Sequence, residues 1–247
     1  MDRALYVALS GATQTLRAQA ANSHNLANAS TTGFKADLVV AEALQVRGEG
    51  FDSRFNARSL EAGIDNRAGT LLSTGRELDV ALAANDWLAV QAADGREAYT
   101  RAGELQVDAD GLLRTRGGQE VLGEGGSIQI PPNSQLSIGS DGSVSVIPLG
   151  QTSGTAVTVG RLKIVHAEPT QLARAGDSLF FAREGSPPLE TSSGAKVVSG
   201  ALESSNVNIA ESMVTMIELA RNFELQTRAM KSADENAQQA ASLLRMK

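Results

Sequence analysis

A serine and a group of carboxylates are the side chains in this sequence whose types and spacing could do chemistry. Gly176-Asp177-Ser178-Leu179 spells a serine esterase signature, in which the serine would be a nucleophile with a histidine as its base. Such enzymes take that base from near the C-terminus, but no histidine follows His166. The pattern therefore favours a turn leading into a strand over a catalytic serine.

A pair of carboxylates could instead support glycoside hydrolysis, and several lie within a short span: Asp86, Asp94, Glu104, Asp108 and Asp110. Most of them adjoin Gly or Asn, where an aspartate commonly forms a turn. Residues 108–111 also resemble the start of a calcium loop, but Leu112 and Leu113 follow where further oxygen ligands are required. We therefore expect turn-forming carboxylates here.

The composition removes most other kinds of active site. There is no cysteine and only His24 and His166, which leaves no material for thiol chemistry, a zinc site or a histidine triad. No Gly-rich phosphate loop is present, which argues against a nucleotide enzyme. A net charge of -6 with scattered basic residues disfavours nucleic acid as a partner, and no run approaches the roughly 20 apolar residues of a membrane span. The sequence thus predicts no catalytic residue, cofactor, metal or small-molecule substrate.

The first thirty residues predict a long helix. Positions alternately four and three residues apart form one stripe, the spacing of a heptad repeat: Leu5, Leu9, Ala12, Leu16, Gln19, Ser23 and Leu26. The helix should stop near residues 30–33, where Gly33 can adopt the left-handed conformation of a C-cap. A cleaved secretory leader is the disfavoured alternative, because Asp2 offsets Arg3 and polar residues interrupt the apolar stretch.

The last forty residues repeat the pattern more strongly and predict a helix from about Ile209 to Met246. Apolar residues recur every seven positions: Ile209, Met216, Phe223, Met230, Ala237 and Leu244. A second, partly polar stripe is expected beside them: Met213, Ala220, Thr227, Asp234 and Ala241. Helices of this kind bury their stripes only against each other or against other chains.

The middle of the chain changes to the period of β strands. Short alternating or β-branched runs occupy residues 127–130, 135–138, 143–147 and 157–165. Three Asp-Gly pairs, at 94–95, 110–111 and 141–142, are the strongest short signal for a hairpin. An antiparallel β domain is therefore predicted.

These patterns predict an α+β protein, with long N- and C-terminal helices pairing as a coiled-coil-like layer and a central antiparallel β domain. We expect a discontinuous helical domain made of an N-terminal helix at 1–34 and a C-terminal helix at 205–247. Extended connectors at 35–75 and 185–204 should join these helices to the β domain at 76–184.

Segments from both ends of the chain resemble one protein family. Residues 27–35, Ala-Asn-Ala-Ser-Thr-Thr-Gly-Phe-Lys, are similar to the N-terminal signature of the flagellar axial proteins of the rod and hook. Residues 200–208 and 213–217 resemble that family's C-terminal signature, and 74–81 and 99–103 resemble its β-domain motifs. His24 departs from the family's usual Asn-Asn pairing. Within the family, the Met-Asp-Arg start and the length resemble the proximal-rod group, with distal-rod or hook-type subunits as the alternative.

The resemblance implies a non-catalytic structural subunit of the bacterial flagellar basal-body rod, an axle in the periplasm that transmits torque and surrounds the export channel. It implies export without a cleaved signal peptide, with the export apparatus, other rod subunits and copies of this chain as partners. A secreted serine or carboxylate hydrolase is the alternative from another class. Residues in the terminal segments are expected to make the subunit contacts: Leu5, Leu9, Leu16, Asn25, Leu26, Asn28, Thr32, Gly33, Phe34, Leu202, Glu203, Asn206, Met213, Met216, Ile217, Phe223, Met230 and Leu244.

Overall fold

The computed structural model describes residues 3–45, 55–59, 63–132, 134–148, 156–176, 178–192, 194 and 196–245. The chain forms two compact units, each built from segments far apart in the sequence. One unit comprises residues 1–27, 37–63 and 208–247, and the other comprises 28–36 and 64–207. The predicted α+β class is confirmed, because a helix lies at each end of a central antiparallel β domain.

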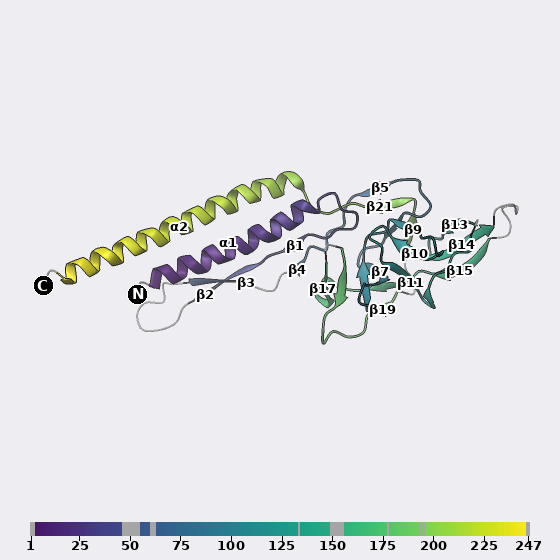
Figure 1. Ribbon diagram of the computed structural model, residues 1–247, viewed down its shortest axis with the longest axis horizontal. Coiled ribbons are helices and arrows are strands. Elements are labelled where there is room, and N and C mark those ends of the chain that lie inside the picture. The colour runs from purple at the N-terminus through teal and green to yellow at the C-terminus, as the bar shows by residue number, and fades with distance from the viewer. Residues whose placement is uncertain are drawn as a thin grey trace. The chain divides into compact units, whose positions relative to one another are not determined.

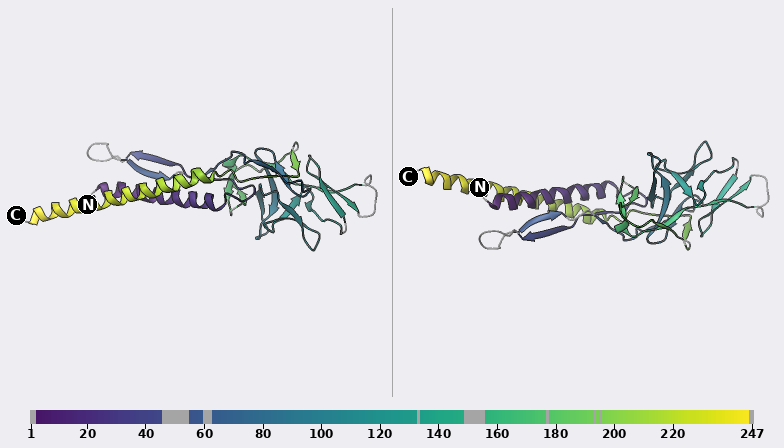
Figure 2. Two further views of the ribbon diagram at one scale, coloured as in Figure 1. Left: turned by 90° about the horizontal axis from the view of Figure 1, so that it is seen from above. Right: turned by 90° about the horizontal axis from the view of Figure 1, so that it is seen from below.

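Two helices, α1 (Arg3–Ala27) and α2 (Ile209–Arg245), lie side by side in the first unit (Figures 1 and 2). Helix α2 matches its predicted segment, whereas α1 ends at Ala27, before the predicted end near residues 30–33. Helix α2 begins with Asn208 accepting hydrogen bonds at its side-chain oxygen from the backbone of Ala210 and Glu211. Asn22 Nδ2 donates to the backbone oxygen of Ser212 at 2.8 Å. A Cβ at Gly11 would lie 3.0 Å from the Gln226 side chain. Because the earlier residue of α1 contacts the later residue of α2, the two helices run antiparallel.

A hairpin packs on α1 in the same unit. It consists of β2 (Ala41–Gln45) and β3 (Phe55–Ser59), and the backbone N–H of Ala57 donates to Ser10 Oγ at 3.2 Å. Two-residue strands, β1 (Asp37–Leu38) and β4 (Gly63–Ile64), flank the hairpin in sequence. The span 35–75, expected as an extended connector, thus contains short strands alternating with described residues that are not in strands, such as 65–70.

The second unit contains a branched antiparallel sheet in the order β17-β18-β8-β7-β11-β10-β9, to which β12, β16 and β19 add. A three-stranded sheet (β13-β14-β15) and two pairs (β20-β6 and β21-β5) complete it. The bounds are β5 (Leu71–Ser73), β6 (Val80–Leu82), β7 (Asp86–Gln91), β8 (Glu97–Thr100), β9 (Leu105–Val107), β10 (Leu113–Thr115), β11 (Glu120–Gly123), β12 (Gly126–Ser127), β13 (Ser134–Ile138), β14 (Ser143–Pro148), β15 (Val157–Arg161), β16 (Ile164–His166), η1 (Pro169–Gln171), β17 (Leu172–Arg174), β18 (Phe180–Ala182), β19 (Glu190–Thr191), β20 (Val197–Ser199) and β21 (Ala201–Glu203).

All three hairpins predicted from Asp-Gly pairs are confirmed. They join β7 to β8, β9 to β10 and β13 to β14, and Gly95, Gly111 and Gly142 each have a positive φ. In each turn an aspartate oxygen accepts a backbone N–H two residues ahead, for example Asp94 Oδ1 from Arg96 at 3.0 Å. The dipeptide therefore sets these turns locally.

The core of the second unit is mostly aliphatic, as the low aromatic content requires. One cluster of buried Val, Leu and Ile includes Val80, Leu88 and Leu113, while a smaller one surrounds Trp87. The Trp87 ring meets Phe180 edge-on at 4.9 Å, and its Nε1 donates to the backbone oxygen of Ala167. Among the described residues, no helix is long and apolar enough to cross a bilayer.

Candidate assembly site at the terminal signatures

The two terminal signatures meet inside the second unit. The backbone N–H of Gly33 donates to the Glu203 carbonyl at 2.8 Å, and that of Asn206 donates to the Phe34 carbonyl at 3.3 Å. Glu203 ends strand β21, which pairs with β5 in the register Glu203 to Leu71. Backbone hydrogen bonds thus join the segment that follows α1 to the segment that precedes α2.

The centre of this junction is a buried cluster of three charges. Glu203 Oε1 accepts from Lys35 Nζ at 2.8 Å, and its Oε2 accepts from Arg101 Nη2 and Nε at 2.5 and 2.6 Å. The side chains of Lys35, Arg101 and Glu203 are only 2 to 3% exposed. We call these three residues the Glu203 triad.

Further hydrogen bonds saturate the Glu203 triad. The backbone N–H of Gly69 donates to Glu203 Oε1 at 2.9 Å, and Lys35 Nζ also donates to the carbonyl of Arg67. Arg101 Nη1 donates to the carbonyls of Ala83 and Asp86, and its Nη2 donates to that of Leu82. A buried charge cluster is tolerated only when its polar groups are paired in this way.

Neighbouring charges decide the protonation state of the Glu203 triad. Burial alone would raise the pKa of Glu203, but the positive charge of Arg101 and hydrogen bonds from Lys35 and Gly69 outweigh it and lower that pKa. Burial is the main cause of a lowered pKa at Lys35, opposed by its hydrogen bond to Glu203. Two cations therefore surround one carboxylate, and the lowered pKa of Glu203 favours its ionised form.

Asparagines of the signatures hold the backbone beside this cluster. Asn206 Oδ1 accepts the Ala36 N–H at 2.8 Å, and its Nδ2 donates to the carbonyls of Asp65 and Arg67. In the first unit, Asn25 binds both backbone groups of Asp37 in the same manner. His24 of the same segment has its Nδ1 2.8 Å from Asp37 Oδ2.

Gly33 and Phe34 fill positions that few other residues could occupy. Gly33 has the predicted left-handed conformation, with a φ of 68°, but it does not cap α1, which ends at Ala27. A Cβ at Gly33 would lie 2.2 Å from the Arg101 carbonyl oxygen. The Phe34 ring is fully buried, and the Arg174 guanidinium lies 4.8 Å from its centroid and equally far from that of Phe180. Leu202 is also buried.

The predicted helical stripes match the observed ones only in part. On α1, Ala12 is 3% exposed as predicted, but Leu9 and Leu16 are 48% and 50% exposed. Gly11 and Asn22, each one residue before a predicted stripe position, contact α2. Small or polar residues on that face let the helices approach closely. On α2 the middle of the predicted stripe, Met216, Phe223 and Met230, is half-buried, whereas Ile209 and Ala237 are exposed. Of the companion stripe, Thr227 is half-buried as predicted, but Ser212, Leu219 and Ala233 are shielded in place of Met213, Ala220 and Asp234.

The remaining expected contact residues divide by exposure. Leu5, Asn28, Leu26 and Thr32 are half-buried, whereas Met213 and Ile217 are 55% and 70% exposed. The side chain of Leu244 and residue Asp177 of the esterase-like pattern lie outside the described residues. Ser178 lies in the connection between β17 and β18, where the N–H groups of Ala175 and Gly176 donate to the Leu179 carbonyl, which agrees with the interpretation as a turn.

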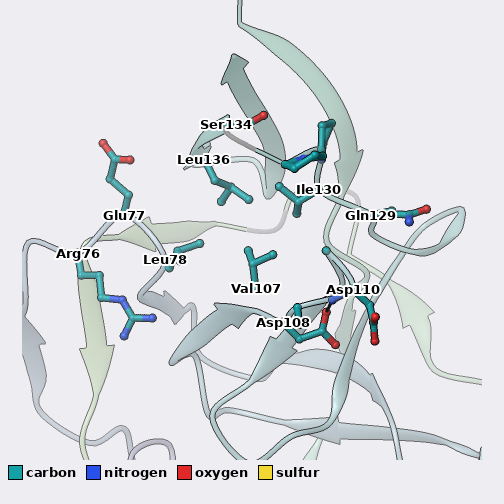
Figure 3. A pocket seen from close by; sticks show the side chains of 14 residues that line it. Arg76, Glu77, Leu78, Val107, Asp108, Asp110, Gln129, Ile130, Ser134 and Leu136 are labelled. Carbon is teal, nitrogen blue, oxygen red and sulfur yellow. Dashed lines mark hydrogen bonds between the residues drawn. The ribbon is translucent and has the colours of Figure 1, made fainter. Parts of the chain in front are cut away.

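The carboxylate pair proposed for glycoside hydrolysis lies at a pocket of about 870 Å³ (Figure 3). Asp108 and Asp110 line one wall, opposite Leu78 and Leu136. Arg114 donates to Asp108 Oδ2 at 2.5 Å, and the N–H groups of Asp110 and Leu112 donate to its Oδ1, so the pKa of Asp108 is lowered. A general acid needs a raised pKa. The arrangement is that of a turn-forming aspartate.

Sequence reasoning included Glu203 among the site residues but omitted Lys35 and Arg101. Both occur in segments that resemble the family, at residues 27–35 and 99–103, so the resemblance contained the signal. Spacing alone could not have paired them, because 168 positions separate Lys35 from Glu203.

Three family descriptions match segments that include this junction. Residues 5–35 match "Flagella basal body rod protein", 81–146 match "Flagellar hook protein FlgE/F/G D1 domain" and 198–243 match "Flagellar basal body rod FlgEFG protein C-terminal". The chain is 42% identical to the flagellar basal-body rod protein FlgF of Escherichia coli and 43% identical to that of Salmonella typhimurium, over the full length of each. It is 34% identical to FlgG of Buchnera aphidicola from Schizaphis graminum, over 90% of this chain and 92% of the relative.

These relatives are structural proteins of the flagellar rod rather than enzymes. Matches at both ends and in the middle cover most of both helices, part of the β domain and both signatures. The chain therefore belongs to the flagellar basal-body rod protein family, as a structural subunit similar to the FlgF members over its full length.

Proposed function

We propose that this rod subunit polymerises through its terminal helices, as part of the proximal rod. The observation that carries the proposal is the contrast between the two units. The second unit buries two apolar clusters of its own, although Leu71, Val157 and Val198 are exposed on it. The described helices of the first unit bury few large apolar side chains and leave several exposed: Leu9, Leu16, Met213 and Ile217. Exposed apolar faces on paired helices are typical of surfaces that bind other chains.

A coiled-coil-like pairing of α1 and α2 forms the inner layer in this proposal. The antiparallel contacts of Asn22 with Ser212 and of Gly11 with Gln226, and the three- and four-residue spacing of the shielded α2 positions, support it. The expected contacts from Leu5 to Leu244 are proposed on the same grounds. In the resulting axle the β domain forms the outer layer, and torque passes from copy to copy along the helices around the export channel.

The Glu203 triad has a mechanical part in this proposal. It fixes the segment after α1 to the segment before α2 through buried, fully paired charges, so that neither can separate without exposing an unpaired charge. Torque is transmitted only through a subunit whose two terminal segments stay joined to its β domain.

The position and route of the subunit are proposed by likeness to the relatives named above. Full-length similarity to FlgF favours the proximal rod, and the FlgG relative keeps a distal or hook-type position as the alternative. Location in the periplasm, contact with the export apparatus and export without a cleaved signal peptide follow from the resemblance of the terminal signatures.

A density map of the isolated basal body, detailed enough to place side chains, tests this proposal. We expect copies of the chain in the proximal rod, with both helices nearest the channel and the β domain outside. Copies joined through their β domains, with the helices free of contact, would refute assembly through the helices.

A further inference from the structure

The first unit carries a groove between the outer face of α1 and strand β3. This pocket of about 410 Å³ is lined by Tyr6, Leu9, Ser10, Arg17, Ala57 and Arg58, among others. Tyr6 and Leu9 are 55% and 48% exposed, so its apolar wall faces solvent. We call it the α1–β3 groove.

The α1–β3 groove has a basic rim. Arg17 and Arg58 are both exposed, and within the described part of the chain neither forms an ion pair with a carboxylate. Glu42 lies opposite Arg58 in the hairpin register, but no ion pair joins the two side chains. The groove therefore offers an apolar wall with two available guanidinium groups.

The first turns of α2 carry the complementary surface. Met213, Val214 and Ile217 are 55%, 56% and 70% exposed, and the exposed carboxylates Glu211 and Glu218 flank them. Seven residues separate the two carboxylates, or about 10 Å along a helix. We call these five residues the acidic α2 face.

Within one copy, the acidic α2 face does not bind the α1–β3 groove. Helix α2 contacts α1 through Ser212 and Gln226, so the acidic α2 face points elsewhere on its own copy. We propose that the acidic α2 face of one copy docks in the α1–β3 groove of a second copy. This inference rests on the proposed polymerisation and names the two surfaces that meet.

The physical case combines apolar burial with opposite charge. Docking removes three exposed apolar side chains from water, and the glutamates on one surface face the arginines on the other, which orients the approach. Because the two surfaces are different, a copy that uses its acidic α2 face to bind one neighbour still has its α1–β3 groove available for another. Such head-to-tail contacts continue into a helical array.

Cross-linking between two tagged copies tests the contact. The chain has no natural cysteine, so each thiol on it is an introduced one. One copy carries Leu9→Cys and the other Ile217→Cys. Both are expressed together in a strain that lacks the natural chain and swims with these two copies in its place. After treatment with a short bis-maleimide, isolated basal bodies should contain the mixed dimer. Leu225→Cys is the matched control, because Leu225 is 53% exposed on the same helix but lies between Arg221 and Arg228. It should not cross-link to Leu9→Cys.

Charge reversal provides the second measurement. The Arg17→Glu and Arg58→Glu double variant should lower the amount of chain in basal bodies by roughly tenfold or more, because like charges would face each other. Adding Glu211→Arg and Glu218→Arg should restore it. Normal incorporation of the first variant, a failure of restoration in a chain with native circular dichroism, or equal cross-linking by the control would each overturn the docking proposal. Absence of the unaltered chain from basal bodies would instead refute the proposed function.

Discussion

The carboxylate of Glu203 lies 2.8 Å from the ammonium of Lys35, although 168 positions separate them in sequence and both side chains are almost completely buried. The same carboxylate binds Arg101, so one anion compensates two cations at the point where the terminal signatures meet. Removing this anion leaves two buried cations without the carboxylate that binds both, and its loss should be far more costly than that of a surface ion pair.

Glu203→Gln should therefore lower the free energy of unfolding by about 3–5 kcal/mol. Urea unfolding followed by the fluorescence of Trp87, the only tryptophan and a buried residue of the same unit, measures this loss. Glu97→Gln is the matched control, because Glu97 lies 2.7 Å from Lys163 and both side chains are about a third exposed. Its cost should stay below about 1 kcal/mol. Equal losses would show that burial of the Glu203 triad has no energetic weight.

The Glu203 triad also predicts a dependence of stability on pH. Because the pKa of Glu203 is lower in the folded chain than its ordinary value, the unfolded chain binds the proton first as the pH falls. The stabilisation is complete above the unfolded pKa of about 4.3 and is lost as the pH falls through the folded pKa. Unfolding free energies measured from pH 7 to pH 3 should decline less steeply for Glu203→Gln than for the natural chain. Parallel curves would contradict the assignment.

A substitution at Gly33 should separate backbone strain from steric overlap. Gly33→Ala combines a positive φ with a Cβ 2.2 Å from the Arg101 carbonyl oxygen, so the backbone beside the Glu203 triad must move. Gly75→Ala has almost the same φ, 70°, but its Cβ would meet no atom within 4 Å. Gly75→Ala should lower the free energy of unfolding by about 1–2 kcal/mol, because alanine disfavours the left-handed conformation. Gly33→Ala should lower it clearly more in the same urea titration. Similar urea midpoints for the two variants would rule out a steric overlap between a Cβ at position 33 and the Arg101 carbonyl oxygen.

The residues that suggested hydrolysis should be dispensable. Strains that carry Ser178→Ala or Asp110→Asn are expected to swim like the natural strain. Ser178 lies in the connection between β17 and β18, and Asp110 lies in the turn between β9 and β10. Swimming zones in soft agar measure this. Turnover of an ester or a peptidoglycan fragment by the purified chain, lost in either variant, would reopen the enzymatic alternative.

Local features of the fold could be predicted from the sequence, because each depends on residues close together in the chain. Asp94, Asp108 and Asp141 bind backbone N–H groups within their own turns, so the Asp-Gly pairs were sufficient to locate three hairpins. The limits of α2 followed from its periodic apolar residues and from the Asn208 cap.

The packing phase of the helices could not be predicted in the same way. A search for large apolar residues selects Leu9 and Leu16, yet the face of α1 that contacts α2 carries Gly11 and Asn22, since small and hydrogen-bonding side chains permit a close approach. The Glu203 triad was beyond prediction for another reason. Its members come from three distant segments, and nothing local to Lys35 or Arg101 distinguishes a buried cation from an exposed one.

The most direct test of assembly through the helices is the incorporation of a Phe223→Asp chain into basal bodies. Phe223 is half-buried on the shielded face of α2, where an unpaired carboxylate costs several kcal/mol, whereas the adjacent Asn222 is exposed. Basal bodies isolated from strains that carry Phe223→Asp or Asn222→Asp as the only copy should lack the first chain and contain the second in normal amount. A Phe223→Asp chain present at the natural level in the rods of motile cells would contradict assembly through the terminal helices.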